Sequence, residues 1–217
     1  MCGRFKLSSD DDTLHAEFGI VLAQDYQPRY NIAPTQSVLA LLSDGETLRP
    51  AALRWGLIPP WEDSPARGAK LINARAETLL QKRSFRDAFE HRRCLILADG
   101  FYEWLRDGKT RTPMLIQRPD RRPFAFAGLW ERWGRGEEKI FSCTIITVPP
   151  ADVVRPIHDR MPLILQRADQ EKWLDPGAGA AELQQLLLPY TGQLEAFAVS
   201  TLVNSPANDS PELMEPV

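Results

Sequence analysis

Short apolar segments recur along most of the chain, and turn residues rather than helices separate them. Strands are predicted at VLALL (38–42), LILA (95–98), FYEW (101–104), PMLI (113–116), FAFAGLW (124–130), FSCTIITV (141–148), PLIL (162–165) and LEAFAV (194–199). The turn dipeptides Asp99-Gly100 and Asp107-Gly108 separate three of these segments, and the second dipeptide suits a hairpin. Strands that outnumber helices and do not alternate with them argue for an α+β fold. We therefore expect a curled, largely antiparallel sheet or barrel at the core, flanked by short helices.

Short helices are expected around this core. The dipeptide Ser9-Asp10 precedes DDTLHAEFGI and predicts a capped helix that ends near Gly19. Ser84, with Asp87 three residues later, predicts a second short helix over FRDAFEHR. Two further helices are predicted at 168–173 and 180–188.

One domain over residues 1–217 is expected, because 217 residues of which 43% are hydrophobic can bury one sizeable core. No apolar run approaches the roughly 20 residues that a helix needs to span a membrane. The N-terminal sequence MCGRFKLSSDDD lacks the apolar core of a signal peptide. We therefore expect a cytoplasmic protein with no membrane partner.

The spacing of cysteine and histidine argues against metal chemistry. The cysteines are three in number and none are closely spaced, which argues against a disulfide framework and against a zinc site. The histidines show no metal-binding spacing either, so no metal or other cofactor is expected. Cys94 and Cys143 lie in apolar stretches and are predicted to be buried core residues, whereas Cys2 lies beside the start of the chain.

Charge is distributed unevenly along the sequence. The formal net charge of −3 argues only weakly against a nucleic-acid partner. Residues 67–93 contain eight basic and three acidic residues, a local charge of +5. Residues 168–217 contain eight acidic residues and one lysine, a local charge of −7. This asymmetry permits an anionic partner on one face of the molecule.

Polar residues interrupt apolar runs in several motifs, and these motifs follow the order found in a known family. They are MCGRF, RYNIAPTQ, WGLIPPW, LINARAET, SFRDAF, CLILADGFYEW, FAFAGLW, TIIT, IHDRMPLIL and VNSPANDSPELMEPV. Through them the chain resembles the SRAP (SOS-response-associated peptidase) family over essentially its whole length. The resemblance implies one α+β SRAP domain, expected as a monomer, that acts in the response to DNA damage. It shields abasic sites in single-stranded DNA by a covalent thiazolidine link to its N-terminal cysteine, and is expected at the nucleoid when bound.

The chemistry of Cys2 is consistent with this implication. Aminopeptidases remove Met1 when the next side chain is small, which leaves a 1,2-aminothiol at Cys2. An abasic deoxyribose opens to an aldehyde, the amine forms an imine with it, and the thiol closes a five-membered ring. An α-amine titrates near about 7.7–8.0 and a thiol near about 8.5, so both have reactive fractions at neutral pH.

The resemblance implies catalytic roles for three further residues. Glu103 would move protons between the amine and the sugar, and its place between Tyr102 and Trp104 predicts a pKa raised by desolvation. His158 would assist imine formation by moving protons or binding the sugar hydroxyl. Asn73 would hold the Cys2 amine or the sugar by hydrogen bonds.

Contacts with DNA require cations for phosphates and flat surfaces for bases. Arginines in the matched motifs are expected to bind phosphates, and Trp61 with Pro34 to form a wedge against bases beside the lesion. Gly3 leaves room for the DNA backbone. The predicted DNA-contact residues are Gly3, Arg4, Asn31, Pro34, Trp61, Arg75, Thr147 and Arg160.

Two segments depart from the family pattern. The turn after TIIT is rich in proline (VPPADVVRP), and the segment NSPANDSPE lacks the basic residue that relatives often have near Pro206-Ala207. We expect a somewhat weaker affinity for DNA and an unchanged reaction.

Two other functions remain open at this point. A thiol peptidase with Cys2 as its N-terminal nucleophile would use Glu103 and His158 nearly as well. That activity does not explain Trp61 together with the arginines. A non-catalytic binder of DNA bases or chromatin would leave the aminothiol unexplained.

Overall fold

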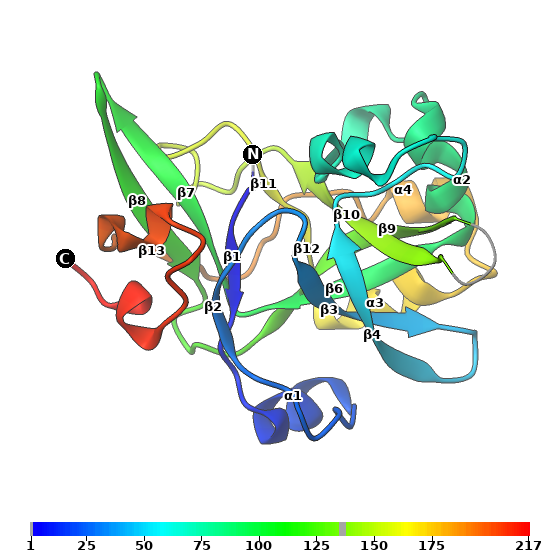
Figure 1. The fold of residues 1–217 in the computed structure, drawn as a ribbon, viewed down its shortest axis with the longest axis horizontal. Helices are drawn as coiled ribbons and strands as arrows, with labels where there is room; N and C mark the ends of the chain where they lie inside the picture. The colour runs from blue at the N-terminus through cyan, green and yellow to red at the C-terminus, as the bar shows by residue number, and fades with distance from the viewer. Residues whose placement is uncertain (1, 135–137) are drawn as a thin grey trace.

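A closed ring of five strands forms the centre of the fold (Figure 1). The computed structural model describes residues 2–134 and 138–217. Around the ring, β10 (Ile140–Val148) pairs with β4 (Leu48–Trp55), followed by β3 (Ser37–Ser43), β6 (Arg93–Ala98) and β9 (Phe124–Trp133), which returns to β10. The β4–β10 pairing is parallel and the other four are antiparallel. The predicted α+β fold with a curled, largely antiparallel sheet is therefore confirmed.

A second sheet lies beside the ring, and all of its strand pairings among the described residues are antiparallel. Its order is β13 (Glu195–Ala198), β8 (Thr110–Gln117), β7 (Gly100–Asp107), β1 (Phe5–Leu7) and β2 (Arg29–Ile32). β7 and β8 form the long hairpin at the left of Figure 1, and Gly108 at its turn has a φ of 57°. The sequence predicted this hairpin, because Asp-Gly dipeptides favour turns with positive φ.

Shorter strands and helices surround the two sheets. The helix α1 (Asp11–Phe18) begins after Asp10, whose side chain accepts a hydrogen bond from the Thr13 N–H at 2.9 Å, and it ends at Gly19, as predicted. The other elements are η1 (Pro65–Lys70), β5 (Asn73–Arg75), η2 (Ala76–Thr78), α2 (Arg83–His91), β11 (Met161–Pro162), β12 (Ile164–Leu165), α3 (Arg167–Leu174), α4 (Ala180–Gln184), η3 (Thr201–Asn204) and η4 (Pro211–Met214).

The sequence interpretation differs from the structure in several elements. α2 begins at Arg83, one residue before the predicted cap Ser84, and α4 ends at Gln184 rather than 188. The predicted strand 162–165 is two short strands separated at Leu163. β1, β2, β4 and β5 were not predicted. Three of these are only three or four residues long, and β4 contains Pro50 and two arginines, so no apolar alternation marks them.

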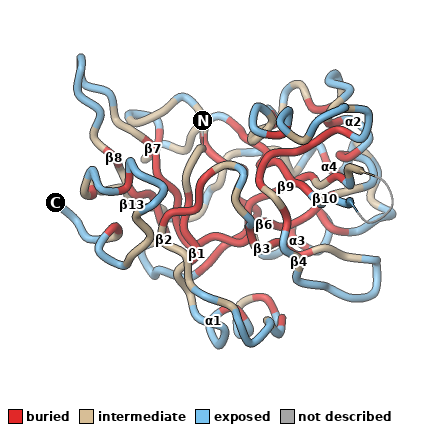
Figure 2. The backbone as a smooth tube through the Cα atoms, in the orientation of Figure 1, coloured by how far each residue is buried: buried red, intermediate tan, exposed pale blue. Residues whose placement is uncertain are grey.

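The strand β1 is anchored by aromatic packing into the ring. The Phe5 ring lies edge-on to Trp55 of β4 at 5.2 Å and to Phe126 of β9 at 5.7 Å between centroids. Buried residues run along the strands at the centre of Figure 2, and they include Cys94 and Cys143, as predicted. The start of the chain is therefore fixed against the core. Among the described residues, no helix is long and apolar enough to cross a membrane.

A buried ion pair fixes β1 at its other end. The Lys6 ammonium lies 2.7 Å from an Asp99 carboxylate oxygen, and both side chains are almost fully buried. Asp99 also accepts hydrogen bonds at 2.7 Å from each of the backbone N–H groups of Ser8 and Ser9. Asp99 lies between β6 and β7, so it ties β1 to the point where the chain passes from the ring to the second sheet.

Candidate active site

The pairing of β1 with β7 brings Cys2 and Glu103 together. Phe5 lies opposite Phe101, and the Tyr102 N–H donates to the Arg4 carbonyl oxygen at 3.0 Å. Continued toward the N-terminus, this register places residues 2–4 beside residues 102–104. Glu103 is only 3% exposed, and its charge acts directly on the Cys2 thiol.

Asn73 reaches the same place from the ring. β5 pairs in parallel with β10, with Asn73 opposite Ile145. The Asn73 Nδ2 group donates to the Cys2 carbonyl oxygen at 2.7 Å. The Asn73 Oδ1 atom is buried and accepts no hydrogen bond from the described residues. This side chain therefore holds the Cys2 backbone with one end and keeps an acceptor at the other.

His158 lies in the proline-rich turn before β11. Its backbone N–H donates to the Val154 carbonyl oxygen at 2.9 Å. The His158 Nδ1 atom accepts from the Arg160 N–H at 3.0 Å, and an Asp159 carboxylate oxygen lies 2.8 Å from the same nitrogen. His158 also interacts electrostatically with Glu103. The structure thus brings together Cys2, Asn73, Glu103 and His158, which come from four separate segments of the sequence.

Burial controls the protonation of this site. Burial raises the pKa of the Cys2 thiol well above its ordinary value, and the negative charge of Glu103 raises it further. Burial also raises the pKa of Glu103, while the charge of His158 opposes that shift. The raised pKa of Glu103 agrees with its predicted desolvation. The Cys2 thiol therefore gives up its proton less readily than an ordinary cysteine, and Glu103, the carboxyl group whose charge acts on it, holds a proton more strongly than usual.

Two of the predicted DNA-contact residues hold the C-terminal segment. The Arg4 guanidinium donates to the Asn31 Oδ1 atom at 2.8 Å and to the Val203 carbonyl oxygen at 2.6 Å. The Asn31 Nδ2 group donates to the Ser205 and Asn208 carbonyl oxygens at 3.0 and 2.8 Å. Asn31 is fully buried and Arg4 is half-buried. Their contact with DNA stays a prediction.

The other predicted DNA-contact residues vary in exposure. Trp61 is 41% exposed, and the Arg83 guanidinium carbon lies 4.2 Å from its ring centroid, a cation–π contact. Arg75 is exposed, whereas Gly3 and Pro34 are half-buried. An exposed ring and an exposed guanidinium are available to a single strand.

Arg160 and Thr147 lie in contact with each other. Thr147 is fully buried, and its carbonyl oxygen accepts from the Arg160 guanidinium at 2.5 Å. Arg160 also forms an ion pair with Glu77. Binding of DNA by these two residues stays a prediction.

Sequence analysis missed Asp209, which also holds the C-terminal segment in place, together with Arg4 and Asn31. Its carboxylate accepts from the Arg29 guanidinium and from the backbone N–H groups of Tyr30 and Asn31, the last at 3.0 Å. The only sequence signal was an acidic residue inside the motif NSPANDSPE. That segment carries the acidic side chain that docks it against β2.

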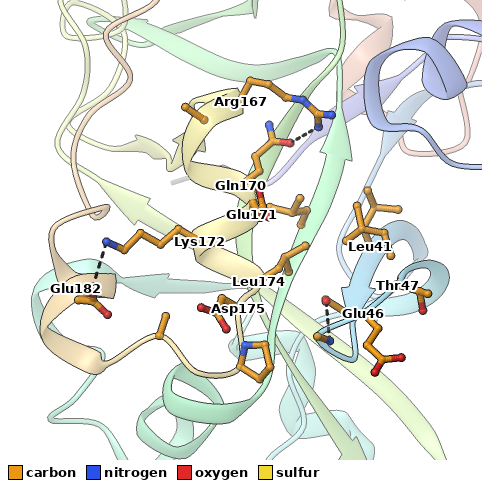
Figure 3. Close-up of a pocket in the computed structure, with 17 residues that line it drawn as sticks. Leu41, Glu46, Thr47, Arg167, Gln170, Glu171, Lys172, Leu174, Asp175 and Glu182 are labelled. Atoms are coloured by element: carbon orange, nitrogen blue, oxygen red, sulfur yellow. Dashed lines mark hydrogen bonds and ion pairs between the residues drawn. The ribbon is translucent and has the colours of Figure 1, made fainter.

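A cavity of about 730 Å³ lies away from these residues, between the β3–β4 hairpin and α3 (Figure 3). Figure 3 shows Arg167 bonded to Gln170 and Lys172 turned toward Glu182, which it meets at 3.4 Å. The residues that line this cavity include none of those predicted for the site. Among the described residues, no group of three or more His, Cys, Asp or Glu side chains could hold a metal ion.

The fold and the site together define a class: an α+β domain whose N-terminal cysteine is held beside a buried glutamate, an asparagine and a histidine. Met1 lies outside the described residues, so its predicted removal is untested. The family model SOS response associated peptidase (SRAP) matches residues 1–206. The chain therefore belongs to the SRAP family.

Curated relatives and a solved structure agree with this assignment. The abasic site processing protein YoqW of Bacillus subtilis is 48% identical over 222 residues, covering 99% of both chains. The abasic site processing protein YedK of Escherichia coli is 33% identical over 227 residues, covering 100% of both. A crystal structure of a protein from Bacteroides thetaiotaomicron matches with a TM-score of 0.87 at 26% identity, covering 100% of both chains.

Proposed function

We propose that this protein recognises abasic sites in single-stranded DNA and links to them covalently through Cys2 after removal of Met1. The observation that carries the proposal is the convergence on Cys2: Asn73 binds its carbonyl oxygen at 2.7 Å, and the buried Glu103 acts on its thiol. The names of the relatives, abasic site processing proteins, support this substrate. The protein would act in the cytoplasm, as a monomer, on nucleoid DNA.

The proposed reaction is an addition, a loss of water and a ring closure. Removal of Met1 replaces an amide nitrogen with a free amine. The amine attacks the aldehyde carbon of the opened sugar, and the resulting carbinolamine loses water to give an imine. The sulfur then adds to the imine carbon while the thiol proton passes to the nitrogen. The thiazolidine traps an imine that would otherwise drive strand cleavage by β-elimination.

Glu103 has a specific task in this sequence. The Cys2 thiol is neutral because its pKa is raised, so the addition of sulfur needs a group that takes its proton. Glu103 is the carboxyl group whose charge acts on that thiol. The raised pKa of Glu103 also makes it an effective acid toward the leaving hydroxyl group.

The burial of Cys2 lends no support to the alternative, a thiol peptidase. Such an enzyme attacks its substrate with a thiolate, and a cysteine prepared for that role has a lowered pKa. Burial raises the pKa of Cys2 instead. An imine is attacked intramolecularly by a thiol that is already in place, so the thiazolidine reaction does not need a thiolate in the resting protein.

The experiment that tests the proposal is a denaturing gel. The protein is mixed with single-stranded DNA that contains uracil and has been treated with uracil glycosylase. We expect a DNA–protein band that survives denaturation, and no such band with a tetrahydrofuran abasic analogue, which has no aldehyde. Capture of the analogue, or intact mass spectra that show full retention of Met1 in an active preparation, would contradict the mechanism.

Replacing Glu103 with glutamine should slow the reaction and stabilise the fold. Positioned acid–base groups contribute about 10²–10⁴-fold in rate, so link formation and its reversal should both slow, with product still reached at long times. Burial raises the pKa of Glu103 in the folded protein above its unfolded value of about 4.3. The protonated carboxyl group therefore stabilises the fold fully below that unfolded pKa, and this stabilisation is lost as the pH rises through the folded pKa. The variant should therefore melt higher than wild type at pH 7 and gain little at pH 4.

A time course with an unlabelled abasic chase measures both rates, and thermal melting at the two pH values measures stability. Wild-type rates of formation and release in Glu103→Gln would show that Glu103 is not the proton shuttle.

Binding of the strand should depend on salt. If three phosphates are neutralised, log K against log salt should have a slope near about −2, from roughly −0.7 per contact in a single strand. Arg75 is exposed, so Arg75→Ala should flatten the slope by about one contact. Arg49→Ala is the matched control, because Arg49 is paired with Asp44 on the distant β3–β4 hairpin. A slope near zero would favour the peptidase function.

A further inference from the structure

An ion pair joins the two segments that carry Asn73 and His158. The Arg160 guanidinium donates to both carboxylate oxygens of Glu77, at 2.5 and 3.0 Å. Glu77 is in η2, directly after the strand β5 that carries Asn73. Arg160 directly precedes β11 and follows His158 by two residues. The contact therefore links residues 83 positions apart in the sequence.

Among the described residues, the strands β5 and β11 next to this contact do not pair with each other. β5 and β11 both pair with β10, and Thr147 of β10 lies opposite Arg75 of β5 and opposite Pro162 of β11. The Arg160 guanidinium bridges this arrangement, since it also donates to the Thr147 carbonyl oxygen at 2.5 Å. The ion pair thus connects β5 to the turn before β11 across the end of β10.

The geometry of the pair suits a fixed contact better than a mobile surface one. The side chain of Arg160 is 12% exposed and that of Glu77 is 51% exposed. A two-point contact between a guanidinium and a carboxylate fixes orientation as well as distance. The hydrogen bond with Arg160 lowers the pKa of Glu77, and the smaller opposing effect of burial does not cancel this shift. Glu77 is therefore charged at neutral pH.

The effect of the pair extends to the His158 ring. The Arg160 backbone N–H donates to the His158 Nδ1 atom at 3.0 Å. Fixing Arg160 therefore fixes a backbone group that contacts this ring, beside the Asp159 carboxylate oxygen that lies 2.8 Å from the same nitrogen. The same contact fixes the position of the ring relative to Asn73, which binds Cys2.

We propose that Glu77 is a positioning residue: through Arg160 it holds the His158 turn against the Asn73 strand, so that both side chains act on the same bound sugar. This inference rests on the proposed function of the site. Positioning matters because a displacement of about 1 Å in a reacting group can cost about 10²-fold in rate. The ion pair contributes to the covalent step and not to the affinity for DNA.

The test separates the covalent step from binding. The variant Glu77→Gln keeps the shape of the side chain but loses its charge. Its cross-linking rate constant is measured at saturating abasic single-stranded DNA, and its Kd is measured with the unreactive tetrahydrofuran analogue. We expect the rate constant to fall about tenfold and the Kd to stay within about twofold of wild type. Glu171→Gln, on the exposed face of α3, is the matched control and should retain both wild-type values.

Non-additivity provides a second readout. Because Glu77 acts through Arg160, the double variant Glu77→Gln/Arg160→Gln should link no more slowly at saturation than Arg160→Gln alone. The imidazole ¹⁵N and ¹H chemical shifts of His158 in the protein without DNA should change in Glu77→Gln and stay at their wild-type values in Glu171→Gln.

Each other outcome overturns the inference. A wild-type rate constant in Glu77→Gln with a tighter Kd would show that Glu77 only competes with phosphate for Arg160. A parallel loss of rate and affinity would show a general structural role. If wild-type protein forms no link at all, the proposed function fails, while the ¹⁵N spectra still report whether Glu77 positions His158.

Discussion

Replacing Cys2 with alanine should abolish the stable cross-link while leaving the protein folded and able to bind abasic DNA. The variant keeps the N-terminal amine, because alanine is also small enough for removal of Met1. It loses the sulfur that traps the imine, so only a transient imine should form, which borohydride can capture, with some strand cleavage. The lost sulfur leaves a small buried void, which should cost about 1 kcal/mol, as for one buried methyl group.

The measurement is a denaturing gel with and without borohydride. Cys94→Ala is the matched control, because Cys94 is equally buried but lies on β6 within the ring. It should link at a rate close to wild type. A borohydride-independent link in Cys2→Ala that equals wild type would mean that another residue is the nucleophile.

Replacing Asp99 with alanine should have the largest effect on stability. The change leaves the Lys6 ammonium buried without its carboxylate, and it removes the acceptor of the Ser8 and Ser9 backbone N–H groups. Loss of one partner from a buried ion pair typically costs about 3–5 kcal/mol. Since β1 carries Cys2 toward the site, the cross-linking activity should fall with the folded fraction.

Urea unfolding monitored by tryptophan fluorescence measures this loss. Asp44→Ala is the control, because Asp44 forms its ion pair with Arg49 at the exposed β3–β4 hairpin, and it should leave the midpoint nearly unchanged. A loss below about 1 kcal/mol for Asp99→Ala would show that water reaches the Lys6 ammonium after the substitution.

The elements that sequence analysis predicted are those with a local signal. The β7–β8 hairpin has an Asp-Gly turn between apolar runs, and α1 has a capping aspartate and a terminal Gly19. β1 and β5 lack any such signal because they have three residues each. They are strands only because longer partners, β7 and β10, offer free edges. Closure of the ring through the parallel β4–β10 pair likewise depends on contacts distant in sequence.

The candidate site was likewise predictable from sequence only in part. Motifs predicted Cys2, Asn73, Glu103 and His158 as candidates, whereas their proximity in the structure depends on the pairing of β1 with β7 and of β5 with β10. Arg4 and Asn31 were predicted to contact DNA because they lie in motifs that match the family, and those motifs gave no hint of a contact with the C-terminal segment. Their partners lie at Val203 and beyond, 199 positions from Arg4 and 172 from Asn31, and no local pattern reports a contact at that separation.

The hydrogen bond from the Arg4 guanidinium to the Val203 carbonyl oxygen also implies an order of events during synthesis. If Met1 is removed as proposed, the aminopeptidase must act before Cys2 takes the fully buried position that it has in the folded protein. The segment that Arg4 binds is made 199 residues later, which takes about 10–40 s at about 5–20 residues per second. Throughout that interval Arg4, two residues from Cys2, lacks this partner. Under the proposed function, the nascent chain on the ribosome is the state in which the amine would be released, and completion of the chain would close the site around it.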